Sequence, residues 1–195
     1  MGQPASKSTA VLPTWVNSSL LQGMLRGIER ESLRMQSDGF LSQADHPQAL
    51  GSALTHPHIT TDYSEALLEF ITPPQPSISE ALHYLKDIHS VAHRHLEHGE
   101  KLWPLSMPCM LDDNDDKIRL AQYGSSNIGK FKTLYRHGLG VRYGRRMQTI
   151  SGLHYNLSFP DQLFEQLQQH ETDEALKALS AQDYRSHRYF GLIRN

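Results

Sequence analysis

The stretch LRGIERESLRM, residues 25–35, alternates as a β-strand does. Successive side chains of a strand point to opposite faces of the sheet, so Ile28 and Arg30 share one face while Glu29 and Glu31 share the other. The next residues, SDGF at 37–40, contain the Asp-Gly pair of a tight turn, after which FLS would return antiparallel. We therefore predict a hairpin within an antiparallel sheet.

Two later segments also alternate as strands. In SEALLEFITPP, residues 64–74, Glu69 lies in a strand whose neighbouring side chains are apolar, and the two prolines end the strand. In TISGLHYNLSF, residues 149–159, His154 lies on a polar face, opposite a face of leucine and aromatic side chains. Both segments are expected to join the same sheet.

Helical spacing is clearest in residues 77–99, where Ser77 and Glu80 form a capping box and Gly99 fits the C-terminal stop. The acidic segment 112–124 predicts a turn and a short strand, residues 131–148 are partly helical, and two helical stretches follow Pro160. Strands and helices do not alternate regularly. This order predicts an α+β fold with an antiparallel sheet flanked by helices, preceded by a loose lead-in over 1–22.

Composition excludes several classes of protein. The net charge of −2 gives no global basic field for nucleic acid or anionic lipid. A single cysteine, Cys109, allows no intrachain disulfide, and we interpret this thiol as buried and inert. No apolar run is long enough to span a membrane. A cytoplasmic protein with neither membrane nor nucleic-acid partners is expected.

Acidic residues on the predicted strands are the first candidate site. Glu29 and Glu31 point to the same side, Asp62 lies in a predicted loop, and Glu69 needs a partner among its apolar neighbours. With His154 they would suit Mg²⁺ or Mn²⁺, with phosphate oxygens completing the shell. An exposed strand of alternating Glu and Arg is also typical of a solvated face, so both interpretations stay open.

GSSNIGKF, residues 124–131, comes close to a phosphate-binding loop. Phe131 stands where that loop needs a hydroxyl for Mg²⁺, and a phenyl ring cannot coordinate a hard cation. We interpret the stretch as a mobile basic loop that leads into Tyr135 and Arg136. The basic segment around it suits a nucleotide phosphate or a carboxylate better than nucleic acid.

Histidine gives a further candidate. His89 and His93 stand four residues apart on the predicted helix and could hold zinc. The surrounding histidines favour a solvated, histidine-rich helix face instead.

Several segments together resemble the amino-terminal portion of bacterial glutamate–cysteine ligase, the proteobacterial type. They are RGIERESLRM, HPQALGSALTHPHITTDYSEALLEFITP, LWPLSMPCML, IRLAQYGSSNIGKFKTLYRHGL and RYGRRMQTISGLHYNLSFP. The resemblance runs in order over residues 23–195 and implies a glutamine-synthetase-like fold with a curved antiparallel sheet. It also implies synthesis of γ-glutamylcysteine from ATP, L-glutamate and L-cysteine through γ-glutamyl phosphate, the first step of glutathione biosynthesis.

The resemblance also implies roles for individual residues. The metal-site positions, for Mg²⁺ or Mn²⁺, match Glu29, Glu31, Asp62, Glu69 and His154. Tyr135 and Arg136 match the region that lines the cysteine and glutamate pockets, with Arg136 as the catalytic candidate.

The family's chains are much longer than this one. We therefore expect the 195 residues alone to be inactive, and we expect the missing C-terminal portion of the same enzyme as a partner. The alternatives are a non-catalytic remnant that binds metal–nucleotide or a full-length ligase, and a related ATP-dependent carboxylate–amine ligase.

Overall fold

The computed structural model describes residues 13–97 and 99–194. Leu25–Leu157 form one compact unit, and the described residues up to Met24 form a second with those from Ser158 onward. The predicted boundary between residues 22 and 23 stays a prediction, because compactness alone does not define a domain. Among the described residues, no helix is long and apolar enough to cross a membrane.

The sheet is built around its longest strand, β1. Within the described residues its path runs β2-β3-β1-β4, and β5 also pairs with β1. Strand β1 pairs antiparallel with β3 and with β4, and β2 pairs antiparallel with β3. The strands are β1 (Leu25–Met35), β2 (Ile59–Thr61), β3 (Leu67–Ile71), β4 (Lys101–Leu102) and β5 (Leu153–Ser158). The strands predicted within 25–35, 64–74 and 149–159, and the α+β class with an antiparallel sheet, are confirmed.

The predicted tight turn closes the end of β1. The Gln36 N–H donates to the Phe40 carbonyl at 2.8 Å, and Met35 pairs antiparallel with Leu41. Gly39 has φ +91°, a conformation that side-chain-bearing residues rarely adopt. The Asp-Gly signal therefore placed the turn correctly.

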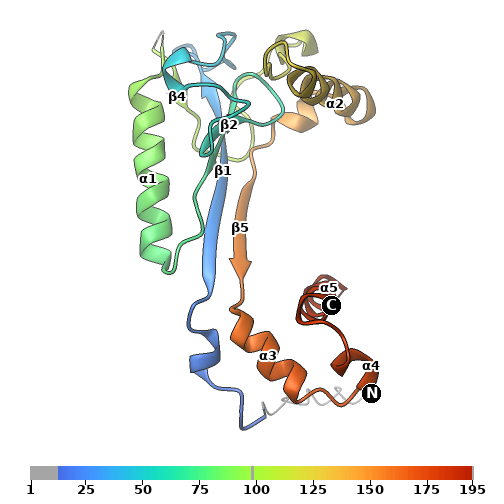
Figure 1. Ribbon diagram of the computed structural model, residues 1–195. Helices are drawn as coiled ribbons and strands as arrows, with labels where there is room; N and C mark the ends of the chain where they lie inside the picture. Colours follow the sequence, from blue (N-terminus) through green and yellow to red (C-terminus); the bar gives the residue numbers. More distant parts are fainter. Residues whose placement is uncertain (1–12, 98, 195) are drawn as a thin grey trace, which may run out of the picture. The chain divides into compact units, whose positions relative to one another are not determined.

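Helix α1 (Ile78–Arg94) covers one face of the sheet, alongside β1 and β3 (Figure 1). Ser77 Oγ accepts from the Glu80 N–H at 3.1 Å, which confirms Ser77 as the N-cap. The Glu80 carboxylate returns to Ser77 as predicted, but it accepts from the hydroxyl at 2.6 Å, whereas in a capping box it accepts from the backbone N–H. Ile88 and Ala92 pack on Leu68 and Phe70 of β3. The predicted end at Gly99 is wrong, because the helix stops at Arg94 with His95 as its C-cap.

Helix α2 (Asn127–Tyr143) begins inside GSSNIGKF, so the loop predicted there is wrong. Ser126 Oγ accepts from the Gly129 N–H at 3.1 Å and caps the helix. A Cβ on Gly129 would lie 2.5 Å from the Tyr123 carbonyl oxygen, closer than real Cβ contacts allow. The second glycine of the near-motif is therefore required by close packing of the helix start on the backbone before it.

The acidic segment contains a short 3-10 helix instead of the predicted strand, and only an isolated bridge, Ser64 to Leu120, follows it. After Pro160 there are three helices where two were predicted. These are α3 (Asp161–Gln169), α4 (Glu174–Lys177) and α5 (Ala181–Arg194). The 3-10 helices of the described chain are η1 (Ser18–Leu21), η2 (Gln48–Leu50), η3 (Asp115–Lys117) and η4 (Arg146–Thr149).

A buried ion pair fixes the far end of β1. Arg34 is fully buried, and its Nη1 lies 3.0 Å from both carboxylate oxygens of Glu100. Its Nη2 donates to the carbonyls of Ala44 and Glu65 at 2.8 and 3.0 Å. These bonds tie the loops that follow the turn and precede β3 to the central strand. Sequence reasoning did not single out this pair.

Candidate active site

Two glutamates lie opposite each other on adjacent strands of the sheet. Glu31 of β1 and Glu69 of β3 are direct partners in the antiparallel register. Side chains in such positions lie close together, and like charges placed opposite one another destabilise a sheet. This register brings two of the five candidate residues together and concentrates negative charge on one face of the sheet.

Glu31 is held in place by β5 and the residues before it. Its Oε2 accepts from the Gly152 N–H at 2.6 Å, and its Oε1 lies 3.8 Å from His154 Nε2. Burial raises the pKa of Glu31, although the Gly152 hydrogen bond opposes this; Asp62 raises it further and His154 lowers it. A Cβ on Gly152 would lie 2.8 Å from His154 Nε2 and 3.2 Å from Glu31 Oε1, so a side chain there would require both of these side chains to shift.

Glu69 is the more perturbed of the two acids. Burial first, and then the charges of Asp62, Glu31 and Glu29, raise its pKa to about 7, with His154 acting in the opposite sense. The acids thus lie near enough to repel one another in a partly desolvated place. A bound cation would relieve that repulsion.

Glu29 and Asp62 complete the acidic group from two sides. Glu29 Oε1 accepts from Asn156 Nδ2 at 2.7 Å, so β5 holds this carboxylate as it holds Glu31. Asp62 lies in the loop between β2 and β3, as predicted. Asn156 was not named as a site residue, although its position two residues after His154 on the polar face was visible in the strand pattern.

Arg136 reaches the same region from α2. Its Nε donates to the Asp62 carbonyl, and its Nη2 lies 3.8 Å from Asp62 Oδ1. Its guanidinium lies over the Tyr123 ring, 4.7 Å from the centroid, and Tyr123 in turn donates to the Thr61 carbonyl at 2.6 Å. Arg136 is thus fixed beside the acidic group by four contacts, including one to the Lys132 carbonyl at 3.0 Å.

Tyr135 lies elsewhere on α2. It is 59% exposed, and no described residue forms a hydrogen bond or ring contact with it. The structure therefore brings Arg136 to the carboxylates but leaves Tyr135 on the helix surface.

The acidic group is not a closed metal shell. Across residues 13–97 and 99–194, no three His, Cys, Asp or Glu side chains converge closely enough to enclose an ion by themselves. Mg²⁺ commonly takes one or two protein carboxylates and completes its shell with water and substrate phosphate oxygens. The five predicted ligands form an electrostatically coupled group, and their role as metal ligands stays a prediction.

The histidines of α1 and Cys109 were the other candidates from the sequence. His83, His93 and His95 are exposed, as predicted for a solvated helix face. His89 is the exception, since it is half-buried against Phe70 with ring centroids 4.4 Å apart. Cys109 is buried, and burial raises the pKa of its thiol, in line with an inert cysteine.

Known proteins share both the sequence and the fold. The family model described as glutamate-cysteine ligase matches residues 10–195. A glutamate–cysteine ligase of Alcanivorax borkumensis is 55% identical over 178 residues, which cover 91% of this chain and 33% of that relative. A glutamate–cysteine ligase of Pseudomonas aeruginosa is 51% identical over 195 residues, covering 100% of this chain and 36% of that relative.

Solved structures agree with these relatives. A crystal structure of glutamate–cysteine ligase from Francisella tularensis in complex with AMP has a TM-score of 0.74 and 42% identity, covering 81% of this chain and 30% of that one. A bifunctional glutathione synthetase from Pasteurella multocida has a TM-score of 0.73 and 34% identity, covering 86% of this chain and 21% of that one. The chain spans about a third of the length of the curated relatives that it matches. It belongs to the glutamate–cysteine ligase family.

Proposed function

We propose that this chain supplies the acidic part of the active site of an enzyme that joins L-cysteine to L-glutamate. The reaction consumes ATP and proceeds through γ-glutamyl phosphate. Family membership supports the reaction class. The role of this site is supported by one observation: Glu31 and Glu69 lie opposite each other, and the pKa of Glu69 is raised to about 7.

The acidic group fits a hard divalent cation. It offers carboxylate oxygens from Glu29, Glu31, Asp62 and Glu69 and an imidazole from His154, and its members repel one another in the absence of a cation. When bound here, Mg²⁺ or Mn²⁺ would neutralise negative charge on the phosphate group that is transferred.

The chemistry has two steps. An oxygen of the glutamate γ-carboxylate attacks the terminal phosphorus of ATP, and the bond from that phosphorus to the ADP oxygen breaks. The cysteine amine then attacks the acyl carbon, phosphate leaves with the electron pair of the C–O bond, and the new amide nitrogen loses a proton to solvent.

Residues of this chain would orient these groups. Gly152 and Asn156 fix the carboxylates of Glu31 and Glu29 through hydrogen bonds of 2.6 and 2.7 Å. Arg136, anchored to the loop of Asp62, would place positive charge beside the transferring phosphate or the substrate carboxylate. We assign Tyr135 to the substrate pocket only from the match of TLYRHGL to the family, since its side chain is exposed.

The test is an assay of the complete gene product with ATP, L-glutamate, L-cysteine and Mg²⁺, in which ADP and γ-glutamylcysteine are both quantified. Equal amounts of the two products support the proposal. Glu31→Gln and Glu69→Gln should each lower the rate by at least about a hundredfold, whereas the exposed Glu165→Gln should leave it unchanged. Unchanged rates in both active-site variants would remove these acids from the mechanism.

The alternatives give different results in the same assay. A non-catalytic remnant would bind Mg²⁺-ATP without forming product, and a related ligase would release ADP only with another amine in place of cysteine. Assaying the 195 residues by themselves tests the expectation that they are inactive alone. Synthesis in the cytoplasm is proposed from the single free thiol, which suits a reducing compartment.

A further inference from the structure

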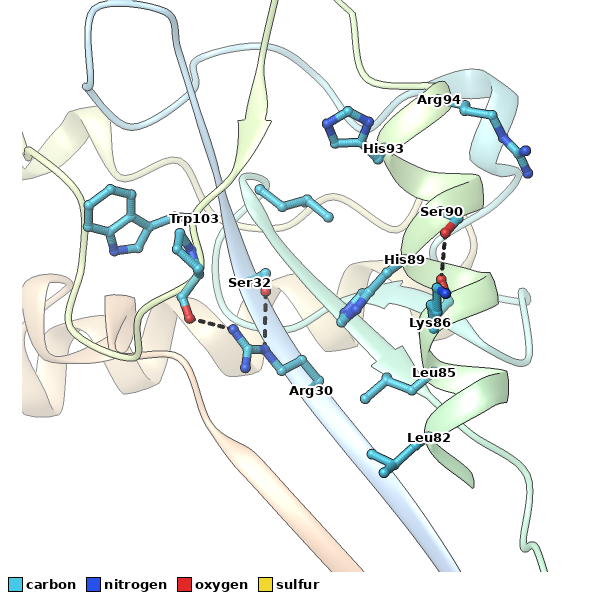
Figure 2. Close-up of a pocket in the computed structure, with 12 residues that line it drawn as sticks. Arg30, Ser32, Leu82, Leu85, Lys86, His89, Ser90, His93, Arg94 and Trp103 are labelled. Atoms are coloured by element: carbon cyan, nitrogen blue, oxygen red, sulfur yellow. Dashed lines mark hydrogen bonds between the residues drawn. The ribbon is translucent and has the colours of Figure 1, made fainter. Parts of the chain in front are cut away.

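A cavity of about 600 Å³ lies between α1 and the sheet, on the side of β1 opposite to the carboxylates. Arg30 and Ser32 alternate along β1 with Glu29 and Glu31, so they point toward α1. Figure 2 shows side chains from β1, from α1 and from the segment after β4 around the same space. Its volume is within the range of small-molecule sites.

The charge around this cavity is of one sign. Arg30, Lys86 and Arg94 line it together with His89 and His93, and no aspartate or glutamate is among the lining residues. In the described part of the chain, none of these three cations takes part in an ion pair, whereas Arg119 and Arg146 pair with aspartates at 2.6 Å. The cavity therefore has positive charge that no nearby acid of the described chain neutralises.

Arg30 is held in position at the inner wall. Its Nη2 donates to the Pro104 carbonyl at 2.6 Å, and its Nε lies 3.5 Å from Ser32 Oγ (Figure 2). Neither partner carries charge, so the guanidinium is oriented without being neutralised. Arginine has five N–H donors in a rigid fork, and those not used here are available to a planar or tetrahedral anion.

His89 adds an unsatisfied polar atom to the same wall. Its Nε2 is buried, and no described residue forms a hydrogen bond with it. Burial, and then the positive charge of Arg30, lower the pKa of His89 and so favour its neutral ring. A buried polar atom without a partner costs free energy, which a ligand atom could recover.

The remaining walls are mostly apolar. Leu82, Leu85, Leu102 and Trp103 line the cavity beside the cations. An inorganic anion would leave this surface without a partner. A ligand that joins an anionic group to an apolar or aromatic group would satisfy both parts of the site.

We propose that this cavity binds a small organic anion, whose carboxylate or phosphate meets Arg30 and whose apolar part packs on Leu85 and Trp103. Lys86 and Arg94 strengthen the positive field at the opening. The site is separate from the substrate site, because it lies across β1 from Glu29 and Glu31. It goes beyond the proposed reaction and is suited to an effector or a second small molecule.

Fluorine NMR titration of the complete gene product tests this proposal. The probes are para-(trifluoromethyl)benzoate, para-(trifluoromethyl)phenyl phosphate and the neutral para-(trifluoromethyl)benzamide. At least one anionic probe should bind at least about tenfold more tightly than the amide, because charge-assisted hydrogen bonds to Arg30 are lost with the charge. The tighter of the two anions identifies the preferred anionic group. Saturating ATP, L-glutamate and Mg²⁺ should not displace either anion.

Variants place the binding in this cavity. Arg30→Gln should weaken binding of the anion by about tenfold. Lys86→Gln should weaken it by about threefold, and this variant should fold normally because Lys86 is exposed on the helix surface. Arg142→Gln, on α2, is the matched control and should have no effect. The proposal is overturned if the amide binds as well as both anions, if the substrates displace the probes, or if Lys86→Gln and Arg142→Gln act alike.

Discussion

Replacing Glu69 by glutamine should stabilise the protein at alkaline pH when no metal is present. The pKa of Glu69 is raised from 4.5 to about 7, so between these values the folded state binds more protons than the unfolded state. Stability contributed by the neutral acid is therefore complete below about pH 4.5 and is lost as the pH rises through about 7.

The size of the effect follows from the shift. A pKa raised by about 2.5 corresponds to at most about 3.4 kcal/mol, and partial exposure of the carboxyl reduces this to about 1–2 kcal/mol. Glutamine resembles the neutral acid, so Glu69→Gln should raise the thermal midpoint at pH 8 by about 2–6 °C and leave it unchanged at pH 4.

Differential scanning calorimetry measures the thermal midpoint in a chelating buffer and again with saturating Mg²⁺. Mg²⁺ should raise the midpoint of the parent protein and raise that of Glu69→Gln much less. Glu165→Gln, an exposed acid on α3, is the control and should follow the parent throughout. A lower midpoint for Glu69→Gln at pH 8 without metal would refute the claim that repulsion among these acids destabilises the sheet.

Three further substitutions test other parts of the structure. Arg34→Met should lower the free energy of unfolding by about 3–5 kcal/mol in a urea titration, because it leaves the Glu100 carboxylate buried without its partner; a loss below 1 kcal/mol would contradict this. Ser77→Ala removes the N-cap of α1 and should cost about 1 kcal/mol in the same titration, and no loss would mean that the cap is not needed. Gly152→Ala should weaken binding of Mg²⁺-ATP in calorimetry by displacing Glu31, while circular dichroism stays unchanged; parent-like affinity would show that the close approach is unimportant.

Local patterns predicted the parts of the fold that depend on neighbouring residues. Alternation in 25–35 and 64–74 identified β1 and β3, and the pair Ser77 and Glu80 identified the start of α1. The end of α1 was predicted wrongly, because glycine is the residue that most often follows the end of a helix and Gly99 fits that position. The helix ends five residues earlier, at Arg94.

Long-range contacts could not be inferred in this way. GSSNIGKF was interpreted as a mobile basic loop, yet α2 begins within it, and Gly129 allows the start of the helix to pack against the Tyr123 backbone. Likewise, no local signal pairs Arg34 with Glu100, which lies 66 residues away.

The candidate site was predicted only in part, because its residues come together through long-range contacts as well as local patterns. Strand alternation placed Glu29 and Glu31 on one face, but the register that sets Glu31 opposite Glu69 is a tertiary property. The bond from Asn156 to Glu29 spans 127 residues and became visible only in the structure. The apolar face predicted for β5 exists, and it is exposed in this chain, with Leu153 64% accessible.

The most direct test of the account is Mn²⁺ binding followed by electron paramagnetic resonance in the complete gene product and in the double variant Glu31→Gln/Glu69→Gln. If the opposed carboxylates hold the metal, the parent should remove free Mn²⁺ from solution in the presence of ATP and the double variant should bind at least about a hundredfold more weakly. Glu165→Gln should bind as the parent does. Equal Mn²⁺ affinity in the parent and the double variant would contradict the central claim.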